Sequence, residues 1–159
     1  MFVCDAGIEY SRGLLHEYAM LANMQLQVGV KVFLQNKAGR YLLLKRNPEA
    51  YPEVQARDQL WDIPGGRIDC GTPLLDNLAR EVREETGLTL TSPPHLVTAQ
   101  DILREDKHVV RLTYHATTDG EPTLDPTEHS EYAWQTKGEL ALQEGFDRYA
   151  KQLLEELPT

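Results

Sequence analysis

The chain has 159 residues with a formal net charge of −9, from 25 acidic and 16 basic side chains, and hydrophobic residues make up 41% of it. These values are typical of one folded domain with its own core. The acidity argues against a sequence-independent grip on a nucleic-acid polymer, which requires clustered Lys and Arg. No apolar run is long enough to span a bilayer, and we expect no signal peptide. Because two cysteines, Cys4 and Cys70, cannot form a disulfide framework, we expect a cytoplasmic protein.

Hydrophobic periodicity and turn residues predict strands interleaved with helices. The first helix is expected at residues 9–23, as part of an N-terminal helical extension (residues 1–24) packed on a single domain of residues 25–159. Strands are expected at residues 25–34, 41–44, 96–104, 107–118 and 132–134. Further helices are expected at residues 73–87 and over most of 138–157, and a polar loop at 47–59 is long enough to contact a ligand. This order indicates an α/β (α+β) fold with a mixed sheet between helices.

The helix at 73–87 has clear boundary signals. Thr72 is a favourable N-cap residue, Pro73 suits the first helical position, and Gly87 ends the run. At about 100° per residue, the apolar and small side chains gather on one face, which we expect to face the core. These side chains belong to Leu75, Leu78, Ala79, Val82 and Thr86.

Three carboxylates, on Glu81, Glu84 and Glu85, occupy one arc of this helix beside the buried face. Like charges at these spacings cost about 0.2–0.5 kcal/mol per pair, and anions in the last turn oppose the helix dipole. An arrangement that opposes stability twice indicates a functional site, and a hard divalent cation such as Mg²⁺ would relieve it. The alternative is a solvated acidic face paired with Arg80 and Arg83, which we expect mainly on other faces of the helix.

The surrounding residues resemble a known signature. Gly66, followed by Arg80-Glu-Val-Arg-Glu-Glu-Thr-Gly-Leu88, is similar to the box of the Nudix hydrolases, and Trp61-x-Ile-Pro-Gly-Gly66 and Glu128–Trp134 also resemble family features. The resemblance implies an α/β/α sandwich with a mixed sheet between helices. The chain departs from the pattern at Thr72, which stands where the family has its first glutamate. We expect the threonine to cap the helix in its place.

The resemblance also implies roles for individual residues. Glu84 and Glu85 would bind the metal together with the carbonyl of Gly65, Glu81 would be a further ligand or the base for the attacking water, and Arg80 would orient the glutamates. Glu128 is the expected downstream carboxylate, which adds a metal ligand or helps to activate water, with Glu131 as the alternative.

The implied reaction is attack of water on a phosphorus of a nucleoside diphosphate linked to another group, with Mg²⁺ (or Mn²⁺) as cofactor. Candidates for holding phosphates are Arg46, Arg57 and Arg67, with Lys45 behind them, although each also fits a solvated surface charge. Tyr51 and Trp61 could stack on a base, but Trp61 also fits packing beneath the loop. His129 could donate to a phosphate, although it also fits a surface position. No motif of the ADP-ribose or dinucleoside-polyphosphate subgroups is found, so a nucleoside triphosphate or a small nucleotide-like diphosphate is favoured by elimination.

Three other interpretations remain open at this point. The Thr72 departure is compatible with a non-catalytic nucleotide or metal sensor on the same fold. An isoprenoid diphosphate isomerase would need a further cysteine and glutamate outside the box, and neither Cys4 nor Cys70 is well placed. A purely structural acidic helix would give no specific response to Mg²⁺. The N-terminal helix could cover the sheet or support a homodimer.

Overall fold

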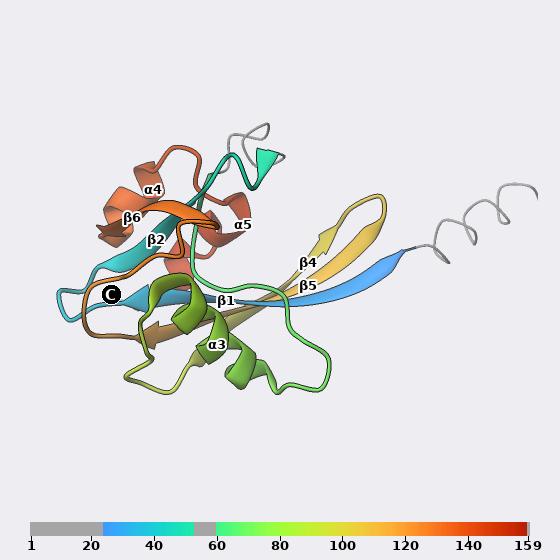
Figure 1. Cartoon of the computed structure of the whole chain (residues 1–159), viewed down its shortest axis with the longest axis horizontal. Helices are drawn as coiled ribbons and strands as arrows, with labels where there is room; N and C mark the ends of the chain where they lie inside the picture. Colours follow the sequence, from blue (N-terminus) through green and yellow to red (C-terminus); the bar gives the residue numbers. More distant parts are fainter. Residues whose placement is uncertain (1–23, 53–59, 159) are drawn as a thin grey trace, which may run out of the picture.

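A computed structural model of the chain describes residues 24–52 and 60–158. A mixed β-sheet lies at the centre, with helix α3 on one side and helices α4 and α5 on the other (Figure 1). The strands are β1 (Gln25–Gln35), β2 (Tyr41–Arg46), β3 (Trp61–Asp62), β4 (His95–Leu103), β5 (Lys107–Thr117) and β6 (His129–Gln135). The helices are α3 (Leu74–Thr86), α4 (Lys137–Leu142), α5 (Arg148–Lys151) and a 3₁₀ turn at Leu154–Glu156.

The strand order is β3-β2-β1-β5-β4, and β6 pairs with β2 outside this path. Strands β1 and β5 run parallel in register from Gln25 opposite Lys107 to Gln35 opposite Thr117. The remaining pairs are antiparallel. One parallel pair among antiparallel ones makes the sheet mixed, which confirms the predicted fold class.

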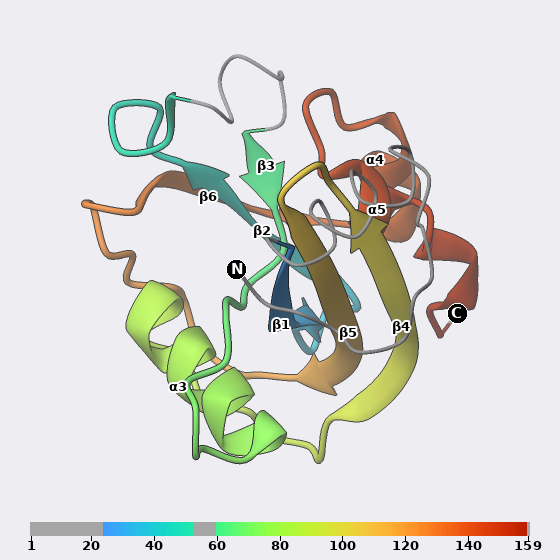
Figure 2. The ribbon, with the colours of Figure 1, turned by 90° about the vertical axis from the view of Figure 1, so that its right-hand side faces the viewer.

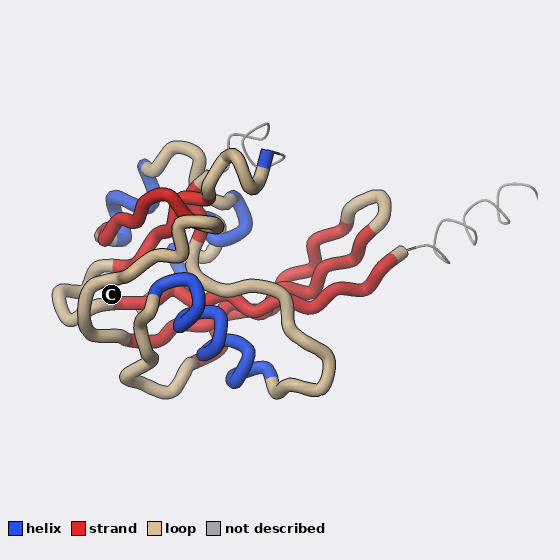
Figure 3. Tube along the Cα trace, viewed as in Figure 1, coloured by secondary structure: helices blue, strands red, loops and turns tan. Residues whose placement is uncertain are grey.

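Two hydrophobic cores lie on the two sides of the sheet, because β1 and β2 alternate the faces to which they turn their apolar side chains. The first core packs helix α3 against the sheet, through Leu78 and Val82 among other residues. The second packs the C-terminal helices against the opposite face, where Phe33 and Tyr41 meet edge to face. Figure 3 shows these helices on either side of the strands. The expected α/β/α layering is confirmed.

One part of the sheet extends beyond both helical layers (Figure 1). We call it the arm: residues 25–29 of β1 and residues 100–111 of β4, β5 and the turn between them. Residues that are paired across adjacent strands point to the same face of the sheet. Leu26, His108 and Leu103 therefore lie on one face, and Gln27 and Val109 lie on the other. Figure 2 shows the arm strands alongside one another.

Most of the predicted elements are present. The segment 138–157 is mostly helical, as expected, but it is divided among α4, α5 and the 3₁₀ turn, with a break after Leu142 where Gly145 adopts a positive φ of 65°. One expectation about α3 is wrong. Leu75 does not face the core, since its side chain is 44% exposed, and the buried face of α3 includes Asn77 and Glu85 instead.

The helix predicted at residues 9–23 lies outside the described residues, as does Cys4. Within residues 24–52 and 60–158, no helix has both the length and the apolar character needed to cross a membrane.

Candidate active site

Two glycines before helix α3 bring the backbone close to the helix carboxylates. Gly65 has a φ of 123°, and its N–H donates to Oε2 of Glu85 at 2.7 Å. A Cβ atom at Gly65 would overlap the carbonyl of Val30, and one at Gly66 would overlap the carboxylate of Glu81. The strand-like pairing of this loop with β1, in which the Val30 N–H donates to the Gly66 carbonyl at 2.9 Å, leaves no room for side chains. The glycines therefore hold β1, the loop and the helix in one compact unit.

The loop is organised by Asn77, not by a cap from Thr72. Helix α3 begins after Pro73 without a side-chain cap hydrogen bond, so the expectation that Thr72 caps it is wrong. The fully buried Asn77 side chain accepts from the Asp69 N–H at 2.9 Å and donates to the carbonyls of Thr72 and Pro73, both at 3.1 Å. Its amide, with donors and an acceptor together, can satisfy both kinds of backbone group. The loop is thus held without a glutamate at position 72.

Arg80 lies among the carboxylates of α3. Its guanidinium contacts Glu81 and Glu84 at 2.7 Å each and Asp69 at 3.1 Å. Arg80 starts from another face of the helix, as expected, but its long side chain bends back toward both glutamates. The arrangement agrees with the orienting role that the family resemblance implies.

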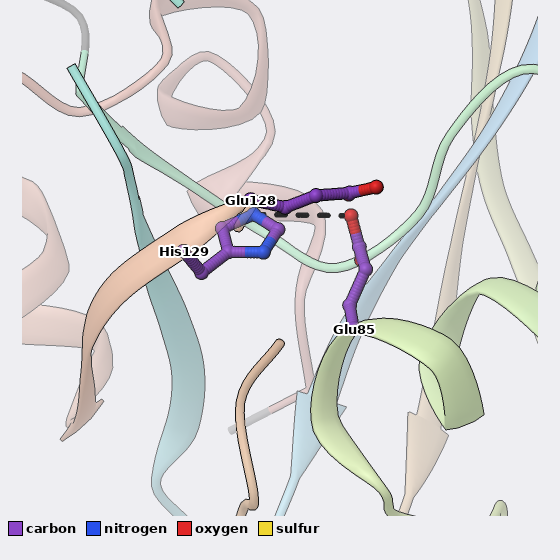
Figure 4. Close-up of side chains that lie close together, drawn as sticks. All are labelled: Glu85, Glu128 and His129. Carbon is purple, nitrogen blue, oxygen red and sulfur yellow. Dashed lines mark ion pairs between the residues drawn. The ribbon is translucent and has the colours of Figure 1, made fainter. Parts of the chain in front are cut away.

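The third glutamate of the arc belongs to a different group. Glu85 lies with Glu128 and His129, and one ligand atom from each of the three falls within 4.8 Å of the others (Figure 4). The Nε2 atom of His129 is 3.8 Å from Oε1 of Glu85. Glu131, the alternative to Glu128, instead pairs with Lys45 at 2.7 Å. His129 is buried, which contradicts the expected surface position.

Glu85 and His129 are buried, and within the described part of the chain they lack some of the hydrogen-bond or ion-pair partners that buried polar groups usually have. Burial raises the pKa of the Glu85 carboxyl to about 7, against the opposing effects of Lys31 and the Gly65 N–H. Burial, together with the charges of Lys31 and Arg46, lowers the pKa of His129 to about 4, so its imidazole is neutral near pH 7. The buried Nδ1 atom of His129 has no hydrogen-bond partner among the described residues. Two carboxylates and a neutral imidazole are a donor set that fits a divalent cation.

A second ionic group lies close by, centred on Asp62 of β3. Its Oδ2 atom contacts the Nζ of Lys31 and a guanidinium nitrogen of Arg46, both at 2.8 Å. Burial alone would raise the pKa of Asp62, but Lys31, Arg46 and the more distant Arg111 outweigh it and hold the pKa well below its usual range. This carboxylate fixes two cations from separate strands.

Both groups open into one cleft of about 420 Å³. Its lining includes Lys31, Arg46, Tyr51, Gly65, Gly66, Arg67, Glu81, Glu85, Arg111, Glu128 and His129, with Arg104, Lys107, Gln27 and Val109 from the arm. Of the expected substrate-binding residues, Arg46, Tyr51 and Arg67 therefore line the cleft, and the Arg46 guanidinium stacks over the Tyr51 ring at 5.2 Å. Trp61 packs against the second core instead, and Arg57 lies outside the described residues.

Glu84 is the one glutamate of the expected metal set that does not line the cleft, since its side chain is exposed and paired with Arg80. Sequence reasoning missed Lys31, Asp62 and Arg111 altogether. A charged residue inside an otherwise apolar strand, such as Lys31 among the valines of β1, was the available signal for a buried ion pair. Cys70 is exposed and does not line the cleft, in keeping with the expectation that it is not well placed for catalysis.

The family model described as "NUDIX domain" matches residues 25–157 of the sequence, and this range includes every residue that lines the cleft. The chain belongs to the Nudix family. The resemblance found in residues 66–88 is therefore confirmed, and with it the prediction of an enzyme, a pyrophosphohydrolase of the Nudix type.

Relatives and solved structures agree with this assignment. The chain is 30% identical over 115 residues to a "Putative 8-oxo-dGTP diphosphatase" of Bacillus subtilis (strain 168), a match that covers 72% of this chain and 69% of that protein. It is also 30% identical over 103 residues to "m7GpppN-mRNA hydrolase NUDT17" of Danio rerio, where the match covers 56% of this chain and only 32% of the relative. The structure of a MutT Nudix hydrolase from Burkholderia pseudomallei is similar with a TM-score of 0.68 and 28% identity, covering 84% of this chain and 99% of that one.

Proposed function

We propose that this Nudix hydrolase is Mg²⁺-dependent and cleaves a nucleoside diphosphate linked to another group, with a nucleoside triphosphate or a similar nucleotide as substrate. The observation that carries the proposal is the convergence of Glu85, Glu128 and His129 in a cleft that Lys31 and Arg46 also line. Carboxylates suit a metal, and the fixed cations suit phosphate oxygens. The relatives named for action on 8-oxo-dGTP and on capped mRNA support a nucleotide substrate.

The proposed metal ligands are Glu85, Glu128 and His129, together with Glu81 and the carbonyl of Gly65. Glu84, which pairs with Arg80 outside the cleft lining, joins them in this proposal by turning its exposed side chain toward the metal. Bound divalent ions would neutralise phosphate oxygens and lower the pKa of the attacking water. His129 adds a nitrogen that suits Mn²⁺ better than Mg²⁺, so we expect Mn²⁺ to be accepted as well.

Two side chains of α3 have further roles in this proposal: one positions the glutamates, and the other accepts a proton from the attacking water. Arg80 holds Glu81 and Glu84 in place through its two 2.7 Å contacts and so restricts their rotamers before the metal binds. Glu81 is the proposed base: burial raises the pKa of its carboxyl, which makes it a better proton acceptor than an exposed glutamate.

The proposed substrate contacts follow the charges of the cleft. Arg46 and Arg67 bind phosphate oxygens, with Arg57 of the polar loop as a further candidate. Tyr51 is the proposed stacking partner for the base, whereas the packing of Trp61 in the second core favours a structural role. Asp62 neutralises much of the charge of Lys31 and Arg46, which lowers the penalty for burying both.

The test is hydrolysis of a nucleotide panel that includes 8-oxo-dGTP, in the presence of Mg²⁺, with identification of the products. We expect release of phosphate or pyrophosphate, and a loss of about 10³-fold in kcat/KM in the variant E84Q/E85Q. The exposed neighbours Glu155 and Glu156 provide the matched control, E155Q/E156Q, which should retain full activity. Turnover retained by E84Q/E85Q would overturn the proposed site.

A sensor remains the second candidate because Thr72 replaces a family glutamate. A sensor would bind nucleotide without turnover, and the substitution T72E would give the protein hydrolytic activity. The hydrogen bonds of Asn77, which hold the loop in the absence of that glutamate, favour the hydrolase.

A further inference from the structure

Two turns of the same design end in residues that line the cleft. Each begins with Asn or Asp followed by Pro: Asn47-Pro-Glu-Ala-Tyr51 comes directly after β2, and Asp125-Pro-Thr-Glu-His129 leads into β6. Pro suits the second position of a turn, and Asn or Asp suits the first because its side-chain oxygen can accept from the backbone N–H two residues further on. We call residues 47–51 the Tyr51 turn and residues 125–129 the Glu128 turn.

The two turns are closed by the same hydrogen bonds. In each turn, the side chain of the first residue accepts from the N–H of the third, and its carbonyl accepts from the N–H of the fourth and of the fifth. The distances are 3.0, 3.1 and 3.0 Å to Glu49, Ala50 and Tyr51 in the Tyr51 turn, and 2.8, 3.2 and 2.9 Å to Thr127, Glu128 and His129 in the Glu128 turn. The first residue of each turn thus fixes the backbone of the residues that line the cleft, which are Tyr51 in one turn and Glu128 and His129 in the other.

The two turns lie side by side because β2 and β6 pair antiparallel, so that the end of β2 lies beside the start of β6. Asn47 joins them. Its backbone N–H donates to the carbonyl of Glu128 at 2.8 Å, and its side-chain Nδ2 donates to the carbonyl of Pro126 at 3.3 Å. The corresponding Asp125 has no side-chain donor to offer in return. The amide of Asn47 therefore serves both turns: its oxygen closes the Tyr51 turn, and its nitrogen holds the Glu128 turn.

We propose that Asn47 is a positioning residue of the active site, which holds the proposed metal ligands Glu128 and His129 in register with the proposed stacking residue Tyr51. Asn47 does not itself line the cleft, so it acts through these neighbours. Figure 4 shows Glu128 and His129 beside the buried Glu85, and a ligand set of this kind depends on the partners that orient it. This inference rests on the proposed function for the roles of the cleft residues.

Two substitutions separate the two halves of the amide. N47D keeps the oxygen that closes the Tyr51 turn but replaces the donor to Pro126 with a second oxygen, whereas N47A removes both. The dissociation constant of Mn²⁺ alone, measured from the electron paramagnetic resonance of the free ion, should rise about fivefold in both variants. The KM for the best-hydrolysed nucleotide of the panel, at saturating Mn²⁺, should stay within about twofold of the wild type in N47D and rise about fivefold in N47A.

N47D also adds a negative charge close to the proposed cation site. That charge by itself favours binding of a cation, so weaker binding of Mn²⁺ in N47D reports lost positioning. The matched controls are N36D and N36A, in the turn between β1 and β2. The Oδ1 atom of Asn36 accepts the N–H of Ala38 and of Arg40, both at 3.0 Å, but Asn36 does not line the cleft. Both controls should leave the Mn²⁺ dissociation constant and the KM within about twofold of the wild type.

An Mn²⁺ dissociation constant in N47D that equals or falls below that of the wild type would overturn the proposal. So would a rise in KM in N47D as large as the rise in that dissociation constant, because it would indicate that the substitution disturbs both turns alike. E128Q provides a further check. Because Glu128 is one of the groups that Asn47 positions, the effect of N47D on Mn²⁺ binding should shrink when E128Q is also present, and an undiminished effect contradicts the proposal.

Binding of Mn²⁺ requires no turnover, so it separates this proposal from the proposed function. Weaker Mn²⁺ binding in N47D, with unchanged binding in N36D, supports the positioning role even if the chain hydrolyses no nucleotide of the panel. Hydrolysis of the panel by the wild type, together with unchanged Mn²⁺ binding in N47D, supports the hydrolase and overturns the positioning role of Asn47.

Discussion

Asp62 and Glu85 are both almost completely buried carboxylates, 4% and 7% exposed, yet their environments have opposite effects. Asp62 contacts two cations at 2.8 Å, and its pKa is held far below the ordinary value. Glu85 accepts from one backbone N–H, and its neighbour His129 is neutral near pH 7. No Lys or Arg of the described residues lies within ion-pair distance of Glu85, and burial raises its pKa to about 7. Burial alone therefore does not identify a functional carboxylate. The missing counter-charge does, and it marks Glu85 as the place for a cation from solution.

The largest effect is expected from D62N. Removing this carboxylate leaves Lys31 and Arg46 without a counter-charge, and breaking a buried pair costs about 3–5 kcal/mol. Urea unfolding at pH 7 measures the change in free energy of unfolding. The control is D119N, whose partner Lys37 is exposed and whose loss should cost less than about 1 kcal/mol. Similar losses in the two variants would contradict the structural role of Asp62.

The opposite sign is expected for E85Q without metal. Because the pKa of Glu85 is raised from 4.5 to about 7, the folded state binds its proton more tightly than the unfolded state does. The stability of the wild type should fall between these pH values, by up to about 3 kcal/mol. E85Q should therefore be more stable than the wild type at pH 8 and equal to it below pH 4.5.

The matched variant for this comparison is E84Q, which removes a glutamate whose side chain is 58% exposed. It should show no comparable gain at pH 8. Unfolding in urea across pH 4 to 8 with a chelator present measures all three proteins. A loss of stability in E85Q at pH 8 would contradict the account of Glu85.

A smaller effect is expected in the loop that presents the Gly65 N–H to Glu85. N77A removes four hydrogen bonds from a buried position, one of them donated by Arg80, and should cost about 2 kcal/mol. T72A should cost less than about 0.5 kcal/mol, since Thr72 is exposed and does not cap the helix. Thermal or urea unfolding measures both costs, and equal costs would indicate that Thr72 supports the loop as much as Asn77 does.

Sequence patterns predicted the elements that depend on local periodicity. Helix α3 ends where expected because Gly87 takes the left-handed conformation, with a φ of 68°. The alternation in β1 and the apolar run of β2 likewise depend on neighbours along the chain. The break near Gly145 was not predicted, because one glycine in a helical pattern signals either a tolerated residue or a stop, and tertiary packing decides between them.

The site was only partly predictable for the same reason. The arc of Glu81, Glu84 and Glu85 follows from helical geometry alone, but its division into an exposed pair on Arg80 and a buried Glu85 depends on where the loop and β6 pack. The ion pairs of Asp62 join residues from three separate strands. Periodicity predicts the face to which a side chain points, and it does not predict which strand lies beside it.

Glu85 lacks a counter-charge that the working protein takes from solution as a cation, and the dependence of the free energy of unfolding on Mg²⁺ tests this most directly. The free energy of unfolding at pH 8 should rise with Mg²⁺ concentration in the wild type, by about 2.7 kcal/mol at a hundredfold excess over the dissociation constant. The rise should shrink toward pH 5, where protons compete for Glu85, and should be absent in E85Q. An equal Mg²⁺ response in the wild type and E85Q, or none in either, would contradict the claim.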